Sequence, residues 1–225
     1  MLRCREPEKT ETQIQYYGQR QKQQKRSEKA EEGKTESLAP DSQVFLRFAF
    51  VQSARVLIFV DEANVVSSAR SSGRGIDWLK LRDYLTQTDK GRGLLEMVVY
   101  AGLPPGIPEW QGELDKKNKF IFWLRSHGFM VVTKEGSPAE EKRYKANVDV
   151  LMAIDAIELS VQMRPDVVVL VTGDADFAHL ALQLRRRGIR VEVASIAKTL
   201  GGILKAAANE IVDLAPLFDS FEAMG

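Results

Sequence analysis

Five largely aliphatic runs, separated by stretches with helical spacing, constrain the fold of this chain more than any other feature. The runs are Val56–Val60, Met97–Ala101, Phe129–Thr133, Val167–Val171 and Ile189–Ala194, the last of which includes Arg190 and Glu192. A strand that is apolar at every position is buried on both faces, as in a parallel sheet covered by helices on both sides. The sequence therefore predicts an α/β fold: a three-layer α/β/α sandwich around a central, mainly parallel sheet of five or six strands.

The segments between and after these runs predict the helices of the two outer layers. Right-handed connections between parallel strands place such helices on both faces of the sheet. Glycine and proline at 136–138 predict a loop after the third strand. The expected helices lie near Ile76–Gln87, Leu114–His127, Val148–Met163, Phe177–Arg187 and Leu200–Asn209.

The alternation of strands and helices predicts one domain over residues 55–217, with residues 218–225 as a C-terminal end. Residues 1–40 are polar and of mixed charge, and they have too little apolar surface to offset the entropy of ordering them. We therefore expect a disordered N-terminal tail. Residues 41–54 form a lead-in with one apolar island, Val44–Phe50, which fits either an edge strand or a short packing segment.

The composition narrows the class of protein. The chain has 225 residues, is 44% hydrophobic and has a formal charge of +1, so it can form a substantial core and any nucleic-acid footprint must be local. Its single cysteine, Cys4, cannot form an internal disulfide, and no Cys/His cluster has zinc spacing. No apolar run approaches the length of a membrane span. These features predict a cytoplasmic protein without membrane partners.

Four acidic residues lie where such a sheet brings distant segments together. Asp61 ends the first run, Asp174 and Asp176 follow the fourth, and Asp149 lies at the start of the third helix. If the first and fourth strands are parallel neighbours, their carboxyl ends share one edge, where open α/β folds place their sites. Carboxylates there repel one another unless protons or hard cations neutralise them. The pattern predicts a Mg²⁺ or Mn²⁺ site and metal-dependent chemistry on phosphates.

Helix capping is an alternative explanation for these residues, because Asp and Asn frequently cap helices. Asp61 or Asn64 would cap a helix after the first strand, and Asp174 or Asp176 one after the fourth. One cap needs only one acid, so the pair at 174 and 176 favours a site. In a site, Asn64 would orient a phosphate or a metal-bound water.

Helical periodicity adds information about Asp149. At 100° per residue, Asp155, Glu158 and Gln162 cluster on one side of the helix, which we predict to face solvent. Asp149 falls almost opposite them, where an isolated buried charge would be costly without a partner such as a metal. The alternative is a favourable interaction with the helix dipole in the first turn.

Basic residues near these acids are the predicted contacts to RNA. Nucleic-acid affinity rests on phosphate contacts by Lys and Arg. The cluster nearest Asp149 is formed by Lys142, Arg143 and Lys145, and we assign these residues to substrate binding. Lys116–Lys119 and Arg185–Arg190 contain further basic groups, which fit either a nucleic-acid contact or a solvated surface.

Three segments in order, Phe59–Asn64, Lys145–Val150 and Thr172–Phe177, resemble the NYN domain family, including its LabA-like branch. The closing Ile211–Leu214 also fits, and the resemblance spans about residues 55–217. It implies the PIN-like α/β/α fold and a Mg²⁺- or Mn²⁺-dependent ribonuclease. By this likeness the metal-binding and catalytic residues are Asp61, Asp149, Asp174 and Asp176, with Asn64 beside them. Many members carry glycine after the first acid, whereas this chain has Glu62.

The resulting hypothesis is an endoribonuclease that hydrolyses RNA phosphodiester bonds. The alternative from another class is a non-catalytic RNA-binding or regulatory protein that retains the fold. A phosphatase of the haloacid dehalogenase type is a weaker alternative, because such enzymes need a second acid two residues after the first, where this chain has Ala63.

Overall fold

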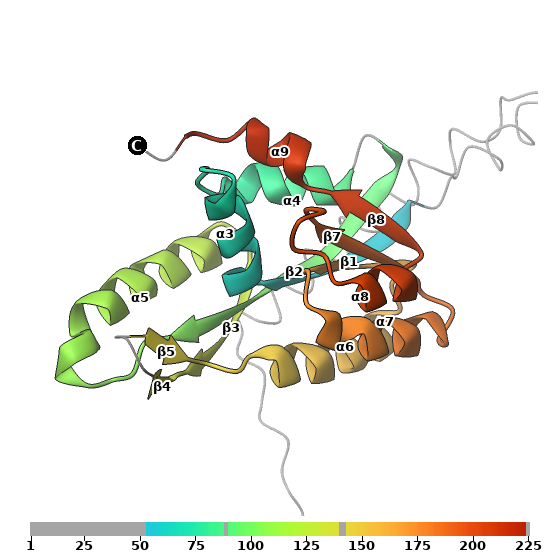
Figure 1. Cartoon of the computed structure of the whole chain (residues 1–225). Coiled ribbons are helices and arrows are strands. Elements are labelled where there is room, and N and C mark those ends of the chain that lie inside the picture. The colour runs from blue at the N-terminus through green and yellow to red at the C-terminus, as the bar shows by residue number, and fades with distance from the viewer. Residues whose placement is uncertain (1–52, 88–89, 140–142, 224–225) are drawn as a thin grey trace, which may run out of the picture. The chain divides into compact units, whose positions relative to one another are not determined.

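The computed structural model describes residues 53–87, 90–139 and 143–223. The predicted tail at 1–40 and all but the last two residues of the lead-in at 41–54 lie outside these ranges. Within them, the predicted α/β/α architecture is confirmed: a central sheet lies between two layers of helices (Figure 1).

The sheet has six strands in the order β3-β2-β1-β6-β7-β8, and every neighbouring pair is parallel. The five aliphatic runs form β1, β2, β3, β6 and β7. The sixth strand, β8, comes from the C-terminal Ile-Val segment and pairs with β7. The strands are β1 (Ala54–Asp61), β2 (Arg92–Leu103), β3 (Met130–Glu135), β6 (Val167–Val171), β7 (Arg190–Ser195) and β8 (Glu210–Asp213).

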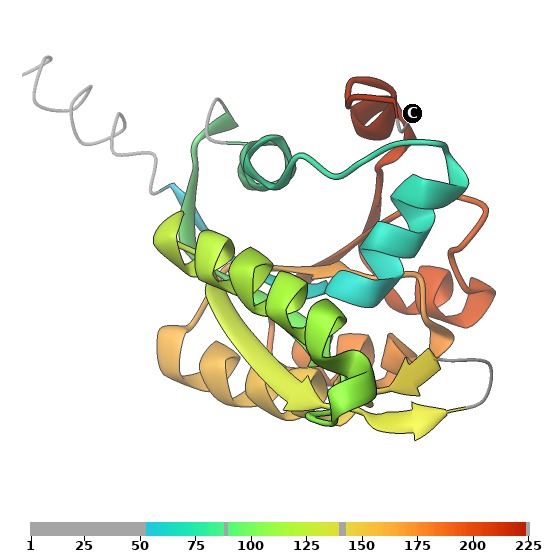
Figure 2. The same ribbon diagram turned by 90° about the vertical axis from the view of Figure 1, so that its left-hand side faces the viewer.

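One face of the sheet is covered by α3 (Glu62–Ser71), α4 (Trp78–Thr86), α5 (Gln111–Ser126) and α9 (Ala215–Asp219). The other face is covered by α6 (Asp149–Met163), α7 (Ala178–Arg185) and α8 (Gly202–Ala207). Figure 2 shows α6 on the opposite side of the sheet from α4. Two single-turn helices, η2 (Pro108–Trp110) and η3 (Ala175–Phe177), precede α5 and α7. The sequence analysis did not predict the extents of α3 and α9.

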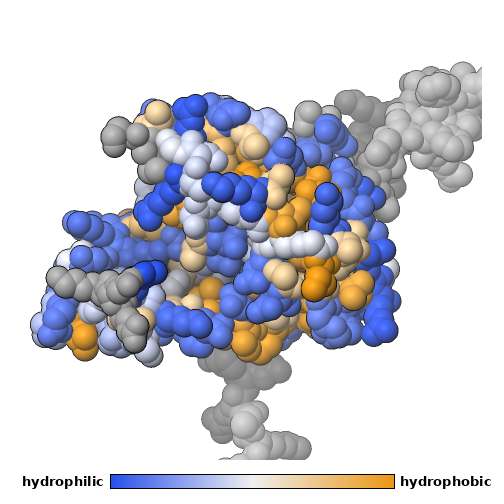
Figure 3. All heavy atoms as spheres, in the orientation of Figure 1, coloured by the Kyte–Doolittle hydropathy of each residue, from blue (hydrophilic) through white to orange (hydrophobic). Residues whose placement is uncertain are grey.

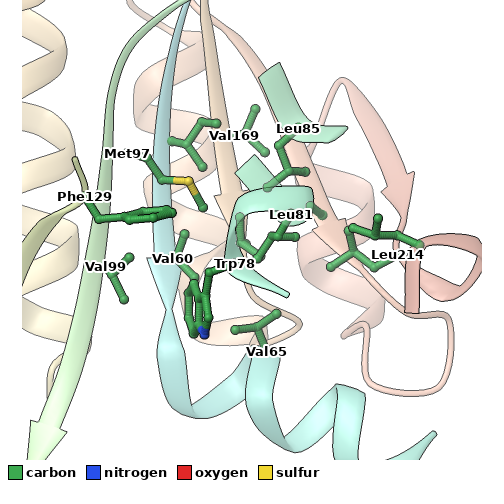
Figure 4. Packing of buried hydrophobic residues seen from close by; sticks show 14 of the residues in the cluster. Val60, Val65, Trp78, Leu81, Leu85, Met97, Val99, Phe129, Val169 and Leu214 are labelled. Carbon is green, nitrogen blue, oxygen red and sulfur yellow. The ribbon is translucent and has the colours of Figure 1, made fainter. Parts of the chain in front are cut away.

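The core between the sheet and the first helix layer is built from aliphatic strand residues and large helix residues (Figure 4). Trp78 packs on Phe129 and Phe120 with ring centroids 6.4 and 5.6 Å apart. Phe218 and Phe221 of the C-terminal segment are also buried in this core, so the packed unit continues past residue 217.

The second core contains a correction to the sequence analysis. Asp155 of α6 does not face solvent as predicted; it accepts a hydrogen bond at 3.0 Å from the hydroxyl of the fully buried Tyr100. Burial and the charge of Asp155 together raise the pKa of Tyr100 well above its ordinary value, so this hydroxyl stays a donor. Glu158 and Gln162 are exposed as predicted, and the exposed surface of α6 also carries apolar side chains, including Val150, Ile154 and Val161.

After β3, the chain forms a hairpin where the sequence predicted only a loop. The strands β4 (Ser137–Ala139) and β5 (Arg143–Lys145) pair antiparallel, apart from the main sheet. Tyr144 anchors the hairpin: its hydroxyl donates to the carbonyl of Gly102 at 3.3 Å, and its ring meets Trp110 edge-on at 5.4 Å. The hairpin therefore lies beside the carboxyl end of β2.

The strand register fixes the edge at which the acidic residues emerge. β1 and β6 are neighbours, and Val60 pairs with Val171, so Asp61 and Thr172 leave the sheet side by side. The parallel arrangement assumed in the sequence analysis is thus confirmed. No helix among the described residues is long and apolar enough to cross a membrane.

Candidate functional site

Asp61 ends β1 and caps α3 at the same time. Its Oδ1 accepts the backbone N–H of Asn64 at 3.1 Å, so the capping explanation is confirmed. The residue is only 7% exposed. Burial is the main cause that raises the pKa of Asp61 to about 6, and the charges of Asp149 and Glu62 act in the same direction. A helix cap alone does not require this burial among other acids.

Asp149 is the first residue of α6 and faces the acids of the β6 turn. Its pKa is raised, first by burial and then by the charges of Asp174 and Asp176, while Lys145 lowers it. Asp61 and Asp149 also repel each other. The four acids predicted from the sequence are therefore linked electrostatically, with Asp149 between Asp61 and the pair at 174 and 176.

The turn after β6 presents Asp174 and Asp176. Asp174 caps η3, because its Oδ1 accepts the backbone N–H of Asp176 at 3.0 Å. The backbone N–H of Asp174 in turn donates to Thr172 Oγ1 at 3.2 Å. Asp174 is half-buried and Asp176 is exposed. As the sequence suggested, one of the two acids caps, and the cap does not explain the other.

Asn64 has a structural contact that the sequence analysis did not predict. Its Oδ1 accepts the backbone N–H of Gly173 at 3.0 Å and so ties the start of α3 to the turn that carries Asp174. A Cβ at Gly173 would lie 2.2 Å from the carbonyl oxygen of Thr199, so only glycine fits there. Asn64 thus fixes the spacing between the two acidic segments, and its role toward substrate stays a prediction.

Glu62 is a residue of the candidate site that the sequence analysis did not assign to it. It is buried beside Asp61, and its Oε2 forms an ion pair at 2.7 Å with Lys117 Nζ on α5. The two side chains are 11% and 16% exposed. Burial and the charge of Glu62 also raise the pKa of Tyr144. The signal available in the sequence was the departure from glycine at this position.

The predicted RNA-contact residues are distributed around β5. Lys145 is exposed and lies close enough to Asp149 to lower its pKa. Arg143 is also exposed on β5, and Lys142 lies outside the described residues. Their role in substrate binding is therefore still a prediction. Of the three, Lys145 is the residue whose charge acts on the pKa of Asp149.

The carboxylate oxygens of the four acids are suitable donors for a hydrated hard cation. In the described part of the chain, no three His, Cys, Asp or Glu side chains converge into a ready-made cage for a metal ion. The four acids are instead linked in pairs through Asp149. Mg²⁺ keeps several of its waters and binds through one or two carboxylates, and Mn²⁺ prefers the same oxygen donors. Such an ion needs no complete protein cage, so the carboxylates present are suited to hold it.

Comparison with known proteins identifies the family. A family model described as the NYN domain matches residues 55–215, well over half of the chain. The chain belongs to the NYN domain family. The family has the PIN-like, nuclease-type fold, and its members are in general nucleases. The predicted family and fold are therefore confirmed for this NYN protein, while its place in the LabA-like branch stays a prediction.

One similar solved structure supports the fold and adds no function. A protein of unknown function from Vibrio parahaemolyticus is 25% identical, with a TM-score of 0.58 over 73% of this chain and 94% of that one. A pyrazinamidase/nicotinamidase from Streptococcus mutans is 12% identical, and its TM-score of 0.32, over 68% of this chain and 93% of that one, is too low to indicate relatedness. The search of curated proteins found no match.

Proposed function

We propose that this NYN protein is a Mg²⁺- or Mn²⁺-dependent endoribonuclease whose site is the acidic edge of the sheet. The observation that carries the proposal is the gathering of four carboxylates there, with Asp149 close enough to repel Asp61 on one side and Asp174 and Asp176 on the other. Burial, together with the charges of Asp149 and Glu62, raises the pKa of Asp61 to about 6. A protein that only needed stability would not gather these acids, because each unneutralised charge costs free energy. A divalent cation removes that cost and supplies the charge that phosphodiester hydrolysis requires.

The residues have distinct roles in this proposal. Asp61 and Asp174 would hold the cation most directly, and Asp149 and Asp176 would bind it directly or through water. When bound, the cation polarises a phosphate and makes water a better nucleophile. The hydrogen bond from the Gly173 N–H to Asn64 keeps the two acidic segments at a fixed spacing.

The surface at this edge is suited to a strand of RNA. The space-filling view is hollowed beside the start of α3, and the residues in the recess are hydrophilic (Figure 3). Lys145, which is close enough to Asp149 to lower its pKa, would meet a phosphate that lies over the acids. The alternative, a non-catalytic RNA-binding protein, is favoured only if RNA binds and metal-dependent cutting is absent.

The test is cleavage of a labelled RNA with Mg²⁺ or Mn²⁺ by the parent, Asp174→Asn and Glu158→Gln. Glu158 is the control, because it is an exposed acid of α6 on its solvent face. We expect Asp174→Asn to lose most of the activity and Glu158→Gln to retain it. Asp174→Asn cutting as fast as the parent would refute the proposed site.

A further inference from the structure

A groove of about 480 Å³ opens between α3 and α5 and begins at the acidic edge. From α3 it is lined by Glu62, Val66 and Arg70, which are four residues apart and so share one face of the helix. Glu62 follows Asp61 directly in the chain. The groove therefore runs from the acids along α3 for about 12 Å, the rise of eight helical residues.

The facing helix lines the groove with a similar face. Lys116, Lys117 and Phe120 of α5 lie three and four residues apart, as neighbours on a helix surface do. Ile76 and Trp78 complete the apolar floor together with Val66 of α3. Figure 1 shows α3 and α5 as separate helices, and both pack on the same face of the sheet. The groove thus has an apolar floor and charged walls.

The charges of this groove favour an anionic ligand. Four cationic residues line it (Arg70, Arg74, Lys116 and Lys117) and only two acidic ones (Glu62 and Glu113). Lys117 neutralises Glu62, and Arg74 donates to the carbonyl of Phe221. Arg70 and Lys116 are exposed, and among the described residues neither side chain has an ion pair or hydrogen bond. Two cations are therefore available on opposite walls.

Another basic cavity in the described part of the chain differs in its lining. It lies along α7, none of the four acids lines it, and its arginines, Arg185, Arg186 and Arg190, lie at or beyond the C-terminal end of that helix. Arg185 donates to a backbone carbonyl, and Arg190 is paired with Glu192 and Glu210. Most of its positive charge is thus used within the fold, which explains this cluster without a ligand.

We propose that the α3–α5 groove binds the single-stranded RNA segment that flanks the scissile phosphate; this inference rests on the proposed ribonuclease function. Arg70 and Lys116 contact two backbone phosphates. An unpaired base packs on the apolar floor beside Phe120, since every base has a face that stacks on an aromatic or apolar surface. Bases in a duplex are already stacked, so paired RNA cannot use this floor. The groove therefore selects single strands.

The test is fluorescence anisotropy with a short labelled single-stranded RNA in EDTA, where no metal-dependent cutting occurs. The variants are Arg70→Gln, Lys116→Gln and the double variant, titrated at several salt concentrations. Each lost phosphate contact on single-stranded RNA lowers the slope of log affinity against log salt by about 0.7. At 0.1 M salt this corresponds to about fivefold weaker binding for each variant, and about 25-fold for the double variant.

Arg186→Gln is the matched control, because it removes the same charge from an exposed arginine at the far end of α7. We expect it to bind like the parent, and we expect a duplex of the same sequence to bind more weakly than the single strand. Double-variant binding within twofold of the parent, equal loss in Arg186→Gln, or a duplex bound as tightly as the single strand would each overturn the groove assignment.

The two proposals fail separately. A parent protein that binds RNA in EDTA but never cuts it with Mn²⁺ would refute the ribonuclease and leave the groove in place. A parent that cuts RNA while Arg70→Gln and Lys116→Gln bind normally would refute the groove and leave the nuclease in place.

Discussion

Asp61→Asn should stabilise the metal-free protein at pH 8. Asp61 is 7% exposed, and its pKa rises from the ordinary 3.8 to about 6, chiefly through burial. Ionising it in the folded protein therefore costs about 3 kcal/mol more than in the unfolded chain, at 1.36 kcal/mol for each tenfold change. The asparagine carries no charge and keeps an oxygen that accepts the Asn64 N–H. The free energy of unfolding should therefore rise by up to about 3 kcal/mol.

The stabilisation by Asp61→Asn should depend on pH. Because its pKa is raised in the folded state, Asp61 binds its proton more tightly there, and the parent loses stability as the pH rises from about 4 to about 6. Asparagine does not titrate. The difference in unfolding free energy between the variant and the parent should thus be near zero below pH 4 and reach its full value above pH 6.

Urea unfolding in EDTA at pH 4 and pH 8 measures this difference directly. At about 2–4 °C per kcal/mol for a domain of this size, the same effect should raise Tm by about 6–12 °C at pH 8. Glu158→Gln, an exposed acid on α6, should change neither value. A less stable Asp61→Asn at pH 8, or an equal difference at both pH values, would contradict the idea that the site is strained by buried negative charge.

Three further substitutions test the packing of the fold, the first of them at the candidate site. Gly173→Ala should destabilise the fold by about 1–3 kcal/mol and reduce cleavage, because the new Cβ would meet the Thr199 carbonyl at 2.2 Å; a thermal melt and the cleavage assay measure both. Arg92→Ala should cost about 3 kcal/mol in urea unfolding at pH 7, since it removes one partner of the buried Glu192 carboxylate. Burial raises the pKa of Glu192, but its hydrogen bonds to Arg92 and Arg190 lower this pKa by more, so the carboxylate stays charged and needs its partners. Tyr100→Phe should cost about 1–2 kcal/mol in the same assay without abolishing RNA cleavage, because it removes only the donor to a carboxylate on α6.

The sheet could be predicted well because a strand buried on both faces has a simple local sequence pattern. Runs such as Val56–Val60 and Val167–Val171 are apolar at every position, and each forms a central strand. Once these strands are parallel neighbours, their ends must share an edge. The approach of Asp61 to the other acids therefore followed from topology without knowledge of any side-chain contact.

Side-chain contacts between different helices and strands have no comparable sequence pattern. Helical periodicity placed Asp155 on the solvent side of α6, but it says nothing about the Tyr100 hydroxyl that β2 presents to that helix. In the same way, the sequence showed Glu62 in place of the glycine that many members carry, but gave no sign of its neutralising partner, Lys117, which lies 55 residues later. Partners of this kind are set by how helices pack on the sheet, which local spacing does not determine.

The arrangement of Asn64 combines both kinds of information. Its position three residues after Asp61 allowed either a helix cap or a contact to a phosphate or a metal-bound water to be predicted. The structure shows instead that the side chain bonds to Gly173, 109 residues away, while the backbone N–H serves Asp61. A residue expected to act on substrate is thus also the link that holds two acidic segments together.

Anomalous diffraction from crystals soaked in Mn²⁺ tests the central claim most directly. We predict a manganese peak at the carboxyl edge of β1 and β6, coordinated by Asp61 and Asp174 with water completing the shell, and its loss in Asp174→Asn crystals. A manganese ion bound elsewhere, with these carboxylates holding none at saturating concentration, would contradict the assignment of this edge as the metal-dependent site.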